Sequence, residues 1–499
     1  MNNPPFRRSL REPALGLAIV FCLALRLVLN LRYGLSYDPN VIWWQMLDTD
    51  LLRHAPLQAL YLMHMQPPLL NALYAVALAL PDSLTSVFLQ ALFVGASLVM
   101  AAILYGFLRR VGYGSLMAGA AAALFASLPD VLLYENIYFY SQLEAVLVLC
   151  ATLFAARYLE EGRLGGFVCL ASTLAALGLL RSLFHLGWVV VVLGAIWLLA
   201  GRRHGRDWRA LLVGIAGIAV VASVYFKNLK EFGIFAASSW EGATLVNMLT
   251  PSLPGDNQKF ADVAQDLEAR VRRGEFSRSM VPALQTPDVW HGWVALARDC
   301  DTGSEKRPPL CRIERANGEL NFNHIAMLGY SRDLGRDAPH LLRLYPRLYL
   351  HHVASSVMTF LGTPAWEYRQ MGAKIGGYVD FWNELLLYRP GRLVGGKTSA
   401  RSWWDSATNR LASSSPVLMV VVLFGLVTAF GRGGLDAWNY WRGRQATADW
   451  VFPALVLALF FVVPNLLNGV ETQRIRYSVE PVLNLAAFAG VATFRRRAR

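Results

Sequence analysis

Hydrophobic residues along this chain are gathered into long runs separated by short polar connectors. A helix needs roughly 18 or more apolar residues to cross the hydrocarbon core of a bilayer, because lipid cannot pair with backbone polar groups. About ten runs reach or approach that length. They lie at residues 14–33, 85–108, 115–133, 141–159, 164–181, 184–200, 208–226, 416–431, 451–468 and 478–494. The pattern predicts an all-α polytopic membrane protein with about ten transmembrane helices.

Two long segments, 34–84 and 227–415, separate these runs. The first contains a short apolar stretch, 66–80, which opens with two prolines and is expected to lie in or dip into the outer leaflet. The second holds a polar stretch, 252–340, that is typical of a small water-exposed domain. The stretch that follows, 341–361, is amphipathic enough to lie on the membrane, and a span there stays open.

Composition agrees with this reading. Hydrophobic residues make up 55% of the chain and charged residues 16%, which excludes an ordinary soluble domain of 499 residues. Three regions are therefore expected: an N-terminal transmembrane module at 1–250, a periplasmic soluble or membrane-surface domain at 251–412, and C-terminal transmembrane helices at 413–499.

The net charge of +13 follows the connectors and does not form one basic stripe, so no nucleic-acid partner is indicated. By the positive-inside rule the basic connectors are cytoplasmic, which places both termini inside and the long segments outside, in a bacterial-type inner membrane. These connectors contain Arg7, Arg8, Arg11, Arg109, Arg110, Arg157, Arg163, Arg202, Arg203, Arg206, Arg209, Arg442, Arg444 and residues 495–499.

The cysteines divide into two groups. Cys22, Cys150 and Cys169 fall in apolar runs, where a thiol acts as a small hydrophobe. Cys300 and Cys311 lie in the polar outer stretch and would close a small loop by a disulfide if that stretch faces an oxidising periplasm. The alternative is two unrelated thiols.

Acidic residues at the outer ends of predicted helices are candidate catalytic groups, because ionisable side chains near a membrane are costly to desolvate. Asp38 follows the first run and could act as a general base on an acceptor hydroxyl; the alternative is a cap, since Pro39 comes next. Glu135 lies at the same level and could orient an acceptor or hold a divalent cation. Its alternative is a solvated loop acid.

Several cations on the predicted outer side are exceptions to the positive-inside rule. An arginine fork pairs with phosphate oxygens and stabilises a phosphate leaving group as its charge develops. The alternative is snorkelling, or pairing with Glu471 and Glu480. The candidate phosphate-binding residues are Arg181, Lys227, Arg474 and Arg476.

Familiar sequence motifs for other chemistries are missing. The chain has no G-x-x-x-x-G-K-[ST] loop for nucleotide hydrolysis and no H-E-x-x-H or C-x-x-C pair for a metal. His54, His64 and the pair His351-His352 are interpreted as interfacial residues and not as metal ligands.

The ordered set of features resembles the GT-C glycosyltransferases, in the branch of protein O-mannosyltransferases and aminoarabinose transferases. The features are Asp38 after the first helix, the Gln66-Pro67-Pro68-Leu69 segment, Glu135 after Leu128-Pro129, Leu180-Arg181, Lys227-Asn228 before Phe232-Gly233, Ser238-Ser239 with Gly242, and the run from Arg474 to Pro481. The resemblance covers most of residues 10–270 and 450–494. Two positions depart from it: Pro39 replaces an acidic residue, and Gln66 replaces a lysine or histidine.

The resemblance implies a polyprenyl-phosphate sugar as donor. It implies Asp38 as catalytic base, Glu135 as second acid, and Arg474 with Arg181 or Lys227 as the donor-phosphate site. The residues assigned to substrate binding, beside these groups in the sequence, are Gln66, Tyr134, Glu471 and Tyr477.

The expected function is inverting sugar transfer to an extracytoplasmic acceptor, which could be lipid A, a surface glycan or a protein. One alternative is a lipid-linked oligosaccharide polymerase or ligase, which would use a pyrophosphate donor. Another is a transporter or flippase, which would be expected to show inverted repeats and helices broken at mid-membrane. Neither feature is visible in the sequence.

Overall fold

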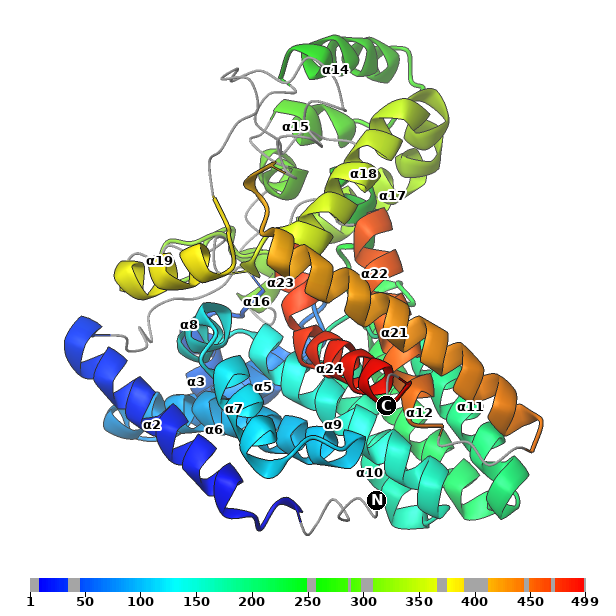
Figure 1. Ribbon diagram of the computed structural model, residues 1–499. Helices are drawn as coiled ribbons and strands as arrows, with labels where there is room; N and C mark the ends of the chain where they lie inside the picture. Colours follow the sequence, from blue (N-terminus) through cyan, green and yellow to red (C-terminus); the bar gives the residue numbers. More distant parts are fainter. Residues whose placement is uncertain are drawn as a thin grey trace.

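The computed structural model (Figure 1) describes residues 9–34, 45–248, 257–285, 289–297, 308–365, 375–389, 412–443, 448–467 and 472–497. Within these ranges the chain is helical, and its one β-type pairing is an isolated antiparallel bridge between Glu314 and Leu320. The all-α prediction is confirmed.

Six helices of the described chain are long and apolar enough to cross a membrane, as a polytopic membrane protein requires. They are α2 (Pro13–Tyr33), α6 (Asp82–Val111), α9 (Tyr140–Glu161), α11 (Leu186–His204), α12 (Trp208–Phe232) and α21 (Pro416–Trp441). Each coincides with one of the predicted runs.

The run predicted as one helix at 115–133 is broken. It forms α7 (Ser115–Ala126) and α8 (Pro129–Ile137), which are bent by 52° and would count as a seventh span if taken together. Leu128, between them, is extended, with φ −60° and ψ 141°, because a residue before proline is disfavoured in the helical region. The prediction of one continuous helix here is therefore wrong.

Other apolar runs form shorter helices. α10 (Leu164–Leu180) and α22 (Val451–Leu467) have 17 residues each. At 1.5 Å per residue they are about 26 Å long, slightly less than the hydrocarbon core. α5 (Leu69–Leu78) has only 10 residues, in line with a helix that does not span. The predicted count of ten spans is not confirmed.

The helix α9 is the centre of the bundle. In the most apolar 18-residue stretch of α9, 78% of the residues are buried, against 22% in the corresponding stretch of α2, which lies at the edge. It contacts α6, α10 and α22, and also α23 (Thr472–Tyr477) and α24 (Glu480–Arg497) from the end of the chain. Alanines along it, such as Ala151 and Ala155, are fully buried and allow these neighbours to approach closely. Groups at the start of α9 therefore lie among helices from distant parts of the sequence.

Several basic connectors meet at one end of the bundle, which we call the basic end. Arg109, at the end of α6, is 2.9 Å from Glu12, which precedes α2. Arg110 pairs with Glu160 at the end of α9, at 3.0 Å. His204, at the end of α11, contacts the carbonyl oxygen of Leu159 at 3.1 Å. The predicted arrangement of these connectors on one side is thus reproduced by their contacts.

The opposite end carries the helices of the long polar segments, of which α14, α15, α17 and α18 are drawn at the top of Figure 1. They are α3 (Thr49–His54), α4 (Pro56–Tyr61), α13 (Glu241–Asn247), α14 (Asn257–Arg272), α15 (Met280–Gln285), the 3-10 helix η1 (Val289–Leu296), α16 (Pro308–Cys311), α17 (Ala326–Leu344), α18 (Pro346–Gly362) and α19 (Gly376–Leu385).

The two predicted outer segments touch each other. The backbone N–H of Ala316 donates to Asp48 at 2.8 Å, and Arg315 donates to the carbonyl of Met46 at 3.0 Å. Asn323 accepts from the backbone N–H of His64 at 2.9 Å. Segments far apart in the sequence therefore form one layer at this end.

The cysteines agree with their predicted environments where they are described. Cys22, Cys150 and Cys169 are free thiols in α2, α9 and α10. Cys311 is disulfide-bonded. Cys300, its predicted partner, lies outside the described residues.

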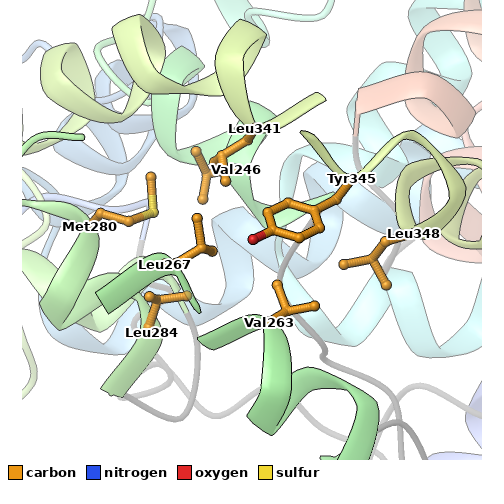
Figure 2. Close-up of a pocket in the computed structure, with 8 residues that line it drawn as sticks. All are labelled: Val246, Val263, Leu267, Met280, Leu284, Leu341, Tyr345 and Leu348. Atoms are coloured by element: carbon orange, nitrogen blue, oxygen red, sulfur yellow. The ribbon is translucent and has the colours of Figure 1, made fainter. Parts of the chain in front are cut away.

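An apolar hollow lies within the outer layer (Figure 2). Its space is about 240 Å³ when the adjoining open solvent is included, and side chains from α13, α14, α15, α17, α18 and the α17–α18 junction line it. The hydroxyl of Tyr345, one of these side chains, donates to Asp266 of α14. The hollow is a packing feature of the helices that form the layer.

A glycine sets the distance between α13 and α17. A Cβ added to Gly242 would lie 1.8 Å from the carbonyl oxygen of Ser331 and 2.6 Å from the backbone nitrogen of Gly335. Since backbone cannot move aside as a flexible side chain can, we expect Gly242→Ala to destabilise the protein by about 1–3 kcal/mol or more. Thermal unfolding in detergent measures the change.

Gly329→Ala is the matched control, because Gly329 lies in α17 and a Cβ there meets nothing within 4 Å. It should leave the midpoint unchanged or raise it slightly, since alanine is the better helix former. Equal midpoints for the two variants would contradict the close contact at Gly242.

Candidate functional site

Two of the predicted phosphate-binding arginines meet at the start of α9. The guanidinium carbon of Arg181 lies 4.7 Å from the ring centre of Tyr140, and that of Arg474 lies 5.4 Å from the same ring and 4.8 Å from Phe139. Arg181 follows α10 and Arg474 belongs to α23. Both arginines are more than nine-tenths buried.

A buried carboxylate completes this group. Arg181 donates to Glu144 at 2.8 Å, Ser478 donates to the same carboxylate oxygen at 2.6 Å, and Arg474 also acts on Glu144 electrostatically. We call Tyr140, Glu144, Arg181 and Arg474 the arginine cluster. Such a group of guanidiniums held over aromatic rings is suited to an anionic ligand, because the forks present planar sets of N–H donors.

The turn that leads into α9 is unusual. Tyr138 has φ 48° and ψ 44°, in the left-handed region that bulky residues rarely adopt. Its carbonyl accepts a hydrogen bond from Tyr74 at 2.7 Å, which holds the turn. Because α8 ends and α9 begins within these few residues, the turn brings Glu135 and the arginine cluster to the same region. Strained turns of this kind are common at functional sites.

Glu135 is not a solvated loop acid. It is 1% exposed and lies near the end of α8. The guanidinium of Arg26, in α2, donates to both of its carboxylate oxygens, from Nε to Oε2 at 2.8 Å and from Nη2 to Oε1. Arg26 also donates to the carbonyls of Cys22 and Ala126 at 2.9 and 3.1 Å. This ion pair therefore ties α2 to the α7–α8 break and holds Glu135 in one orientation.

A polar network joins Glu135 to the end of α23. Ser97 hydrogen-bonds to Glu135 and accepts a hydrogen bond from Gln142, and Gln142 accepts one from the hydroxyl of Tyr477. The ring of Tyr477 stacks on that of Tyr134, with centres 4.3 Å apart. Tyr134 and Tyr477, both predicted to bind substrate, are thus side by side beside the arginine cluster.

Arg476 has a different environment. It is fully buried, and its guanidinium donates to Glu480 at 3.0 Å, to the carbonyl of Thr363 at 2.8 Å and to the carbonyl of Phe360. All three nitrogens therefore contact protein oxygens. The bonds to Phe360 and Thr363 fasten α23 to the end of α18. The bond to Glu480 is the pairing that the sequence left open as the alternative to phosphate binding.

Gln66 belongs to the loop before α5, and Lys227 of α12 contacts this loop. The ammonium group of Lys227 donates to the carbonyl of Met63 and lies 5.5 Å from the ring centre of Phe232. Gln66 accepts a hydrogen bond from Ser182 at 3.2 Å, directly after Arg181 in the chain. Gln66 is therefore close to the arginine cluster, whereas the described contacts of Lys227 are with the loop at Met63 and with Phe232 at the end of α12.

His64 is a buried residue, so its interpretation as interfacial is wrong. Its ring contacts the hydroxyl of Ser239 at 2.8 Å through Nδ1 and the carbonyl of Asn323 at 2.9 Å through Nε2. Burial lowers the pKa of His64 from 6.5 to about 3. The neutral ring donates from Nε2 to the carbonyl and accepts at Nδ1 from Ser239, and so it ties together three segments at this end.

Three predicted residues lie outside the described part of the chain: Asp38, Glu471 and Cys300. The chain returns to the described part at Gln45, whose side chain donates to the hydroxyl of Tyr140 at 3.2 Å. Within the described residues no group of three His, Cys, Asp or Glu side chains is arranged to hold a metal ion.

Two residues of this region were missed from the sequence as site members, Arg26 and Glu144. Each is an ionisable residue within or near the start of an apolar run, and such residues usually have a partner and a function. That signal marks them as important. It does not say that Arg26 pairs with Glu135 or that Glu144 pairs with Arg181.

The Arg26–Glu135 pair leads to a stability prediction. Arg26→Met should destabilise the protein by about 3–5 kcal/mol, because it leaves a buried carboxylate without its partner. The double variant Arg26→Met with Glu135→Leu should recover much of that loss. Unfolding midpoints of wild type, both single variants and the double variant measure the coupling, and additive effects would contradict the pair.

His64 predicts a pH dependence. Because its pKa is lower in the folded protein, the unfolded chain takes up the proton first, so stability is full above pH 6.5 and falls as the pH drops toward 3. The loss is about 1.4 kcal/mol per pH unit.

Unfolding of His64→Gln and wild type at pH 7.5 and pH 5 tests this dependence. Between pH 7.5 and pH 5, the free energy of unfolding of the variant should fall by about 2 kcal/mol less than that of wild type. The same loss in both proteins would show that His64 is not the group that titrates.

Comparison with known proteins adds no relative. No protein-family model, no curated protein and no solved structure matches the chain. The function of the protein is therefore argued from the arrangement of its own side chains.

Proposed function

We propose that the protein is a membrane glycosyltransferase of the GT-C type, which moves a sugar from a polyprenyl-phosphate donor to an acceptor on the outer side of a bacterial inner membrane. The acceptor class includes lipid A, a surface glycan and a protein. The proposal rests on one observation above all: Arg181 and Arg474, from distant parts of the chain, converge on Tyr140 beside Glu144.

This convergence supports phosphate binding for a physical reason. Transfer from a polyprenyl phosphate releases a phosphate monoester, whose negative charge grows as the bond to the sugar breaks. Guanidinium groups already fixed in place stabilise that charge without having to reorganise. The ion pair with Glu144 and the stacking on Tyr140 fix Arg181 in this way.

The proposed step is a single displacement. An acceptor hydroxyl oxygen attacks the anomeric carbon, the bond from that carbon to the phosphate oxygen breaks, and the hydroxyl proton passes to the carboxylate of Asp38. The configuration is inverted, because one displacement occurs without a covalent enzyme intermediate. Glu135, held by Arg26, serves in this proposal as a positioning residue and not as the base.

The placement of the arginine cluster along α9 supports an outward-facing site. Tyr140 and Glu144 begin α9, and the basic end lies at its other terminus, beside Leu159. A helix of 22 residues is about 33 Å long, which is enough to separate the two faces of a bilayer. With the basic end inside, the cluster faces the periplasm.

A transporter or flippase is a second candidate, because the break between α7 and α8 is a feature of transporter folds. Residues near such breaks often contact the substrate, and Arg26 reaches the carbonyl of Ala126 at this break. Movement of an intact lipid-linked sugar, with no bond broken, would favour this candidate.

The enzymatic proposal predicts turnover by the purified protein. Incubated with a panel of polyprenyl-phosphate sugars and acceptors, wild type should release polyprenyl phosphate from at least one donor. Arg474→Gln and Asp38→Asn should each lower kcat by about 100-fold or more, since each removes a group used mainly in the transition state. Product release is followed by mass spectrometry.

Arg163→Gln is the matched control, because Arg163 is an exposed arginine paired with Glu161 at the basic end. It should turn over donor as wild type does. Wild-type rates for Arg474→Gln, or no turnover of any donor in the panel, would refute the enzymatic proposal.

A further inference from the structure

Three helix ends form a compact surface at the basic end. α11 ends at His204, α12 begins at Trp208, and α21 ends at Trp441. The guanidinium carbon of Arg202 lies only 3.4 Å from the ring centre of Trp441, and its Nη1 donates to the carbonyl of the same residue at 2.9 Å. One arginine thus joins the ends of α11 and α21.

Two more arginines on this surface lie over exposed tryptophans. Arg442 lies 4.1 Å from the ring centre of Trp438, and Arg209 lies 5.9 Å from that of Trp208. The three tryptophans remain exposed, at 51% for Trp441, 53% for Trp438 and 63% for Trp208. We call these three arginine–tryptophan pairs the basic aromatic surface.

The surface is held in place by bonds beneath it. Tyr440 donates to the carbonyl of Leu159 at 3.3 Å, and His204 contacts the same carbonyl at 3.1 Å. Trp197 donates to the carbonyl of Asp207 at 3.0 Å. The ends of α9, α11 and α21 and the start of α12 are therefore fixed relative to one another.

Acidic residues described at this end have partners of their own. Glu160 and Asp449 pair with Arg110, Glu161 pairs with Arg163, and Asp436 and Asp207 accept from the backbone N–H groups of Trp450 and Arg209. The exposed arginines at these helix ends are Arg202, Arg203, Arg206, Arg209 and Arg442. The surface therefore carries an excess of positive charge and is complementary to an anion.

Exposed apolar side chains continue from these arginines toward the middle of the bundle. Leu198, which is 46% exposed, lies one turn before Arg202 on the same face of α11. Leu435, which is 62% exposed, lies one turn before Trp438 and two before Arg442 on α21. Each helix thus presents a cation at its end and an apolar residue on the membrane side of it.

We propose that the basic aromatic surface binds the headgroup of an anionic phospholipid from the surrounding bilayer. The arginines contact the phosphate, the tryptophans lie at the level of the headgroups, where their rings are favoured, and the acyl chains cover Leu198 and Leu435. The proposal is independent of the enzymatic activity. A soluble polyanion would match the charge and leave the apolar part of the surface uncovered.

Native mass spectrometry of the full-length protein tests the proposal, with phosphatidylglycerol titrated into a detergent solution and phosphatidylcholine in parallel. Wild type should bind the anionic lipid at least about tenfold more tightly. Arg202→Gln and Arg442→Gln should each weaken that binding roughly fivefold, since one basic group near a lipid surface contributes about 1 kcal/mol. Within the described residues, the side-chain contact of Arg442 is with the exposed ring of Trp438, so its variant tests the proposal even if Arg202→Gln does not fold.

Arg32→Gln is the matched control, because Arg32 is an exposed arginine 5.8 Å from the ring centre of Tyr33 at the far end of α2. Its binding of phosphatidylglycerol should equal that of wild type. Equal affinity for the two lipids, or equal losses in all three variants, would overturn the proposal. It would also be overturned if a short oligonucleotide bound as tightly as the lipid and with the same dependence on Arg442.

Discussion

The constraint behind this structure is that a charge inside an apolar bundle must have a partner. A buried ion is expensive to desolvate, and removing one member of a buried pair leaves that cost uncompensated. The bundle satisfies the constraint with three arginine–carboxylate pairs, Arg26–Glu135, Arg181–Glu144 and Arg476–Glu480. The first joins α2 to α8, which are far apart in the sequence, and the second joins α9 to the end of the next helix, α10. The third joins α23 to the start of α24, and the same arginine fastens α23 to the end of α18.

These pairs also decide where function can reside. An arginine whose nitrogens all contact protein oxygens, as in Arg476, has little capacity left for a ligand. Arg181 and Arg474 instead converge on the ring of Tyr140, and Arg181 also donates to Glu144. The contacts of Arg476 fasten helices, whereas those of Arg181 and Arg474 gather two guanidinium groups at one aromatic ring.

The two ends of α9 have different chemistry. Its start carries the arginine cluster, within a layer of helices and next to a strained turn, while its end underlies the basic aromatic surface. The first is buried and suited to a reacting group, whereas the second is exposed and suited to the headgroups of the bilayer. A donor that is itself a lipid phosphate would need both a membrane that positions the protein and a pocket that excludes water.

The sequence by itself determined the class of the fold and most of the helices, because the length and spacing of apolar runs report directly on burial in lipid. It located the basic connectors, and it singled out Arg181, Arg474, Tyr134 and Tyr477. Only the tertiary structure decided the partners. The break before Pro129 comes from a local backbone clash with the preceding residue, which the apolar pattern of residues 115–133 does not report. The pairs of Glu135 with Arg26 and of Glu144 with Arg181, and the burial of His64, depend on long-range packing, which sequence spacing does not encode.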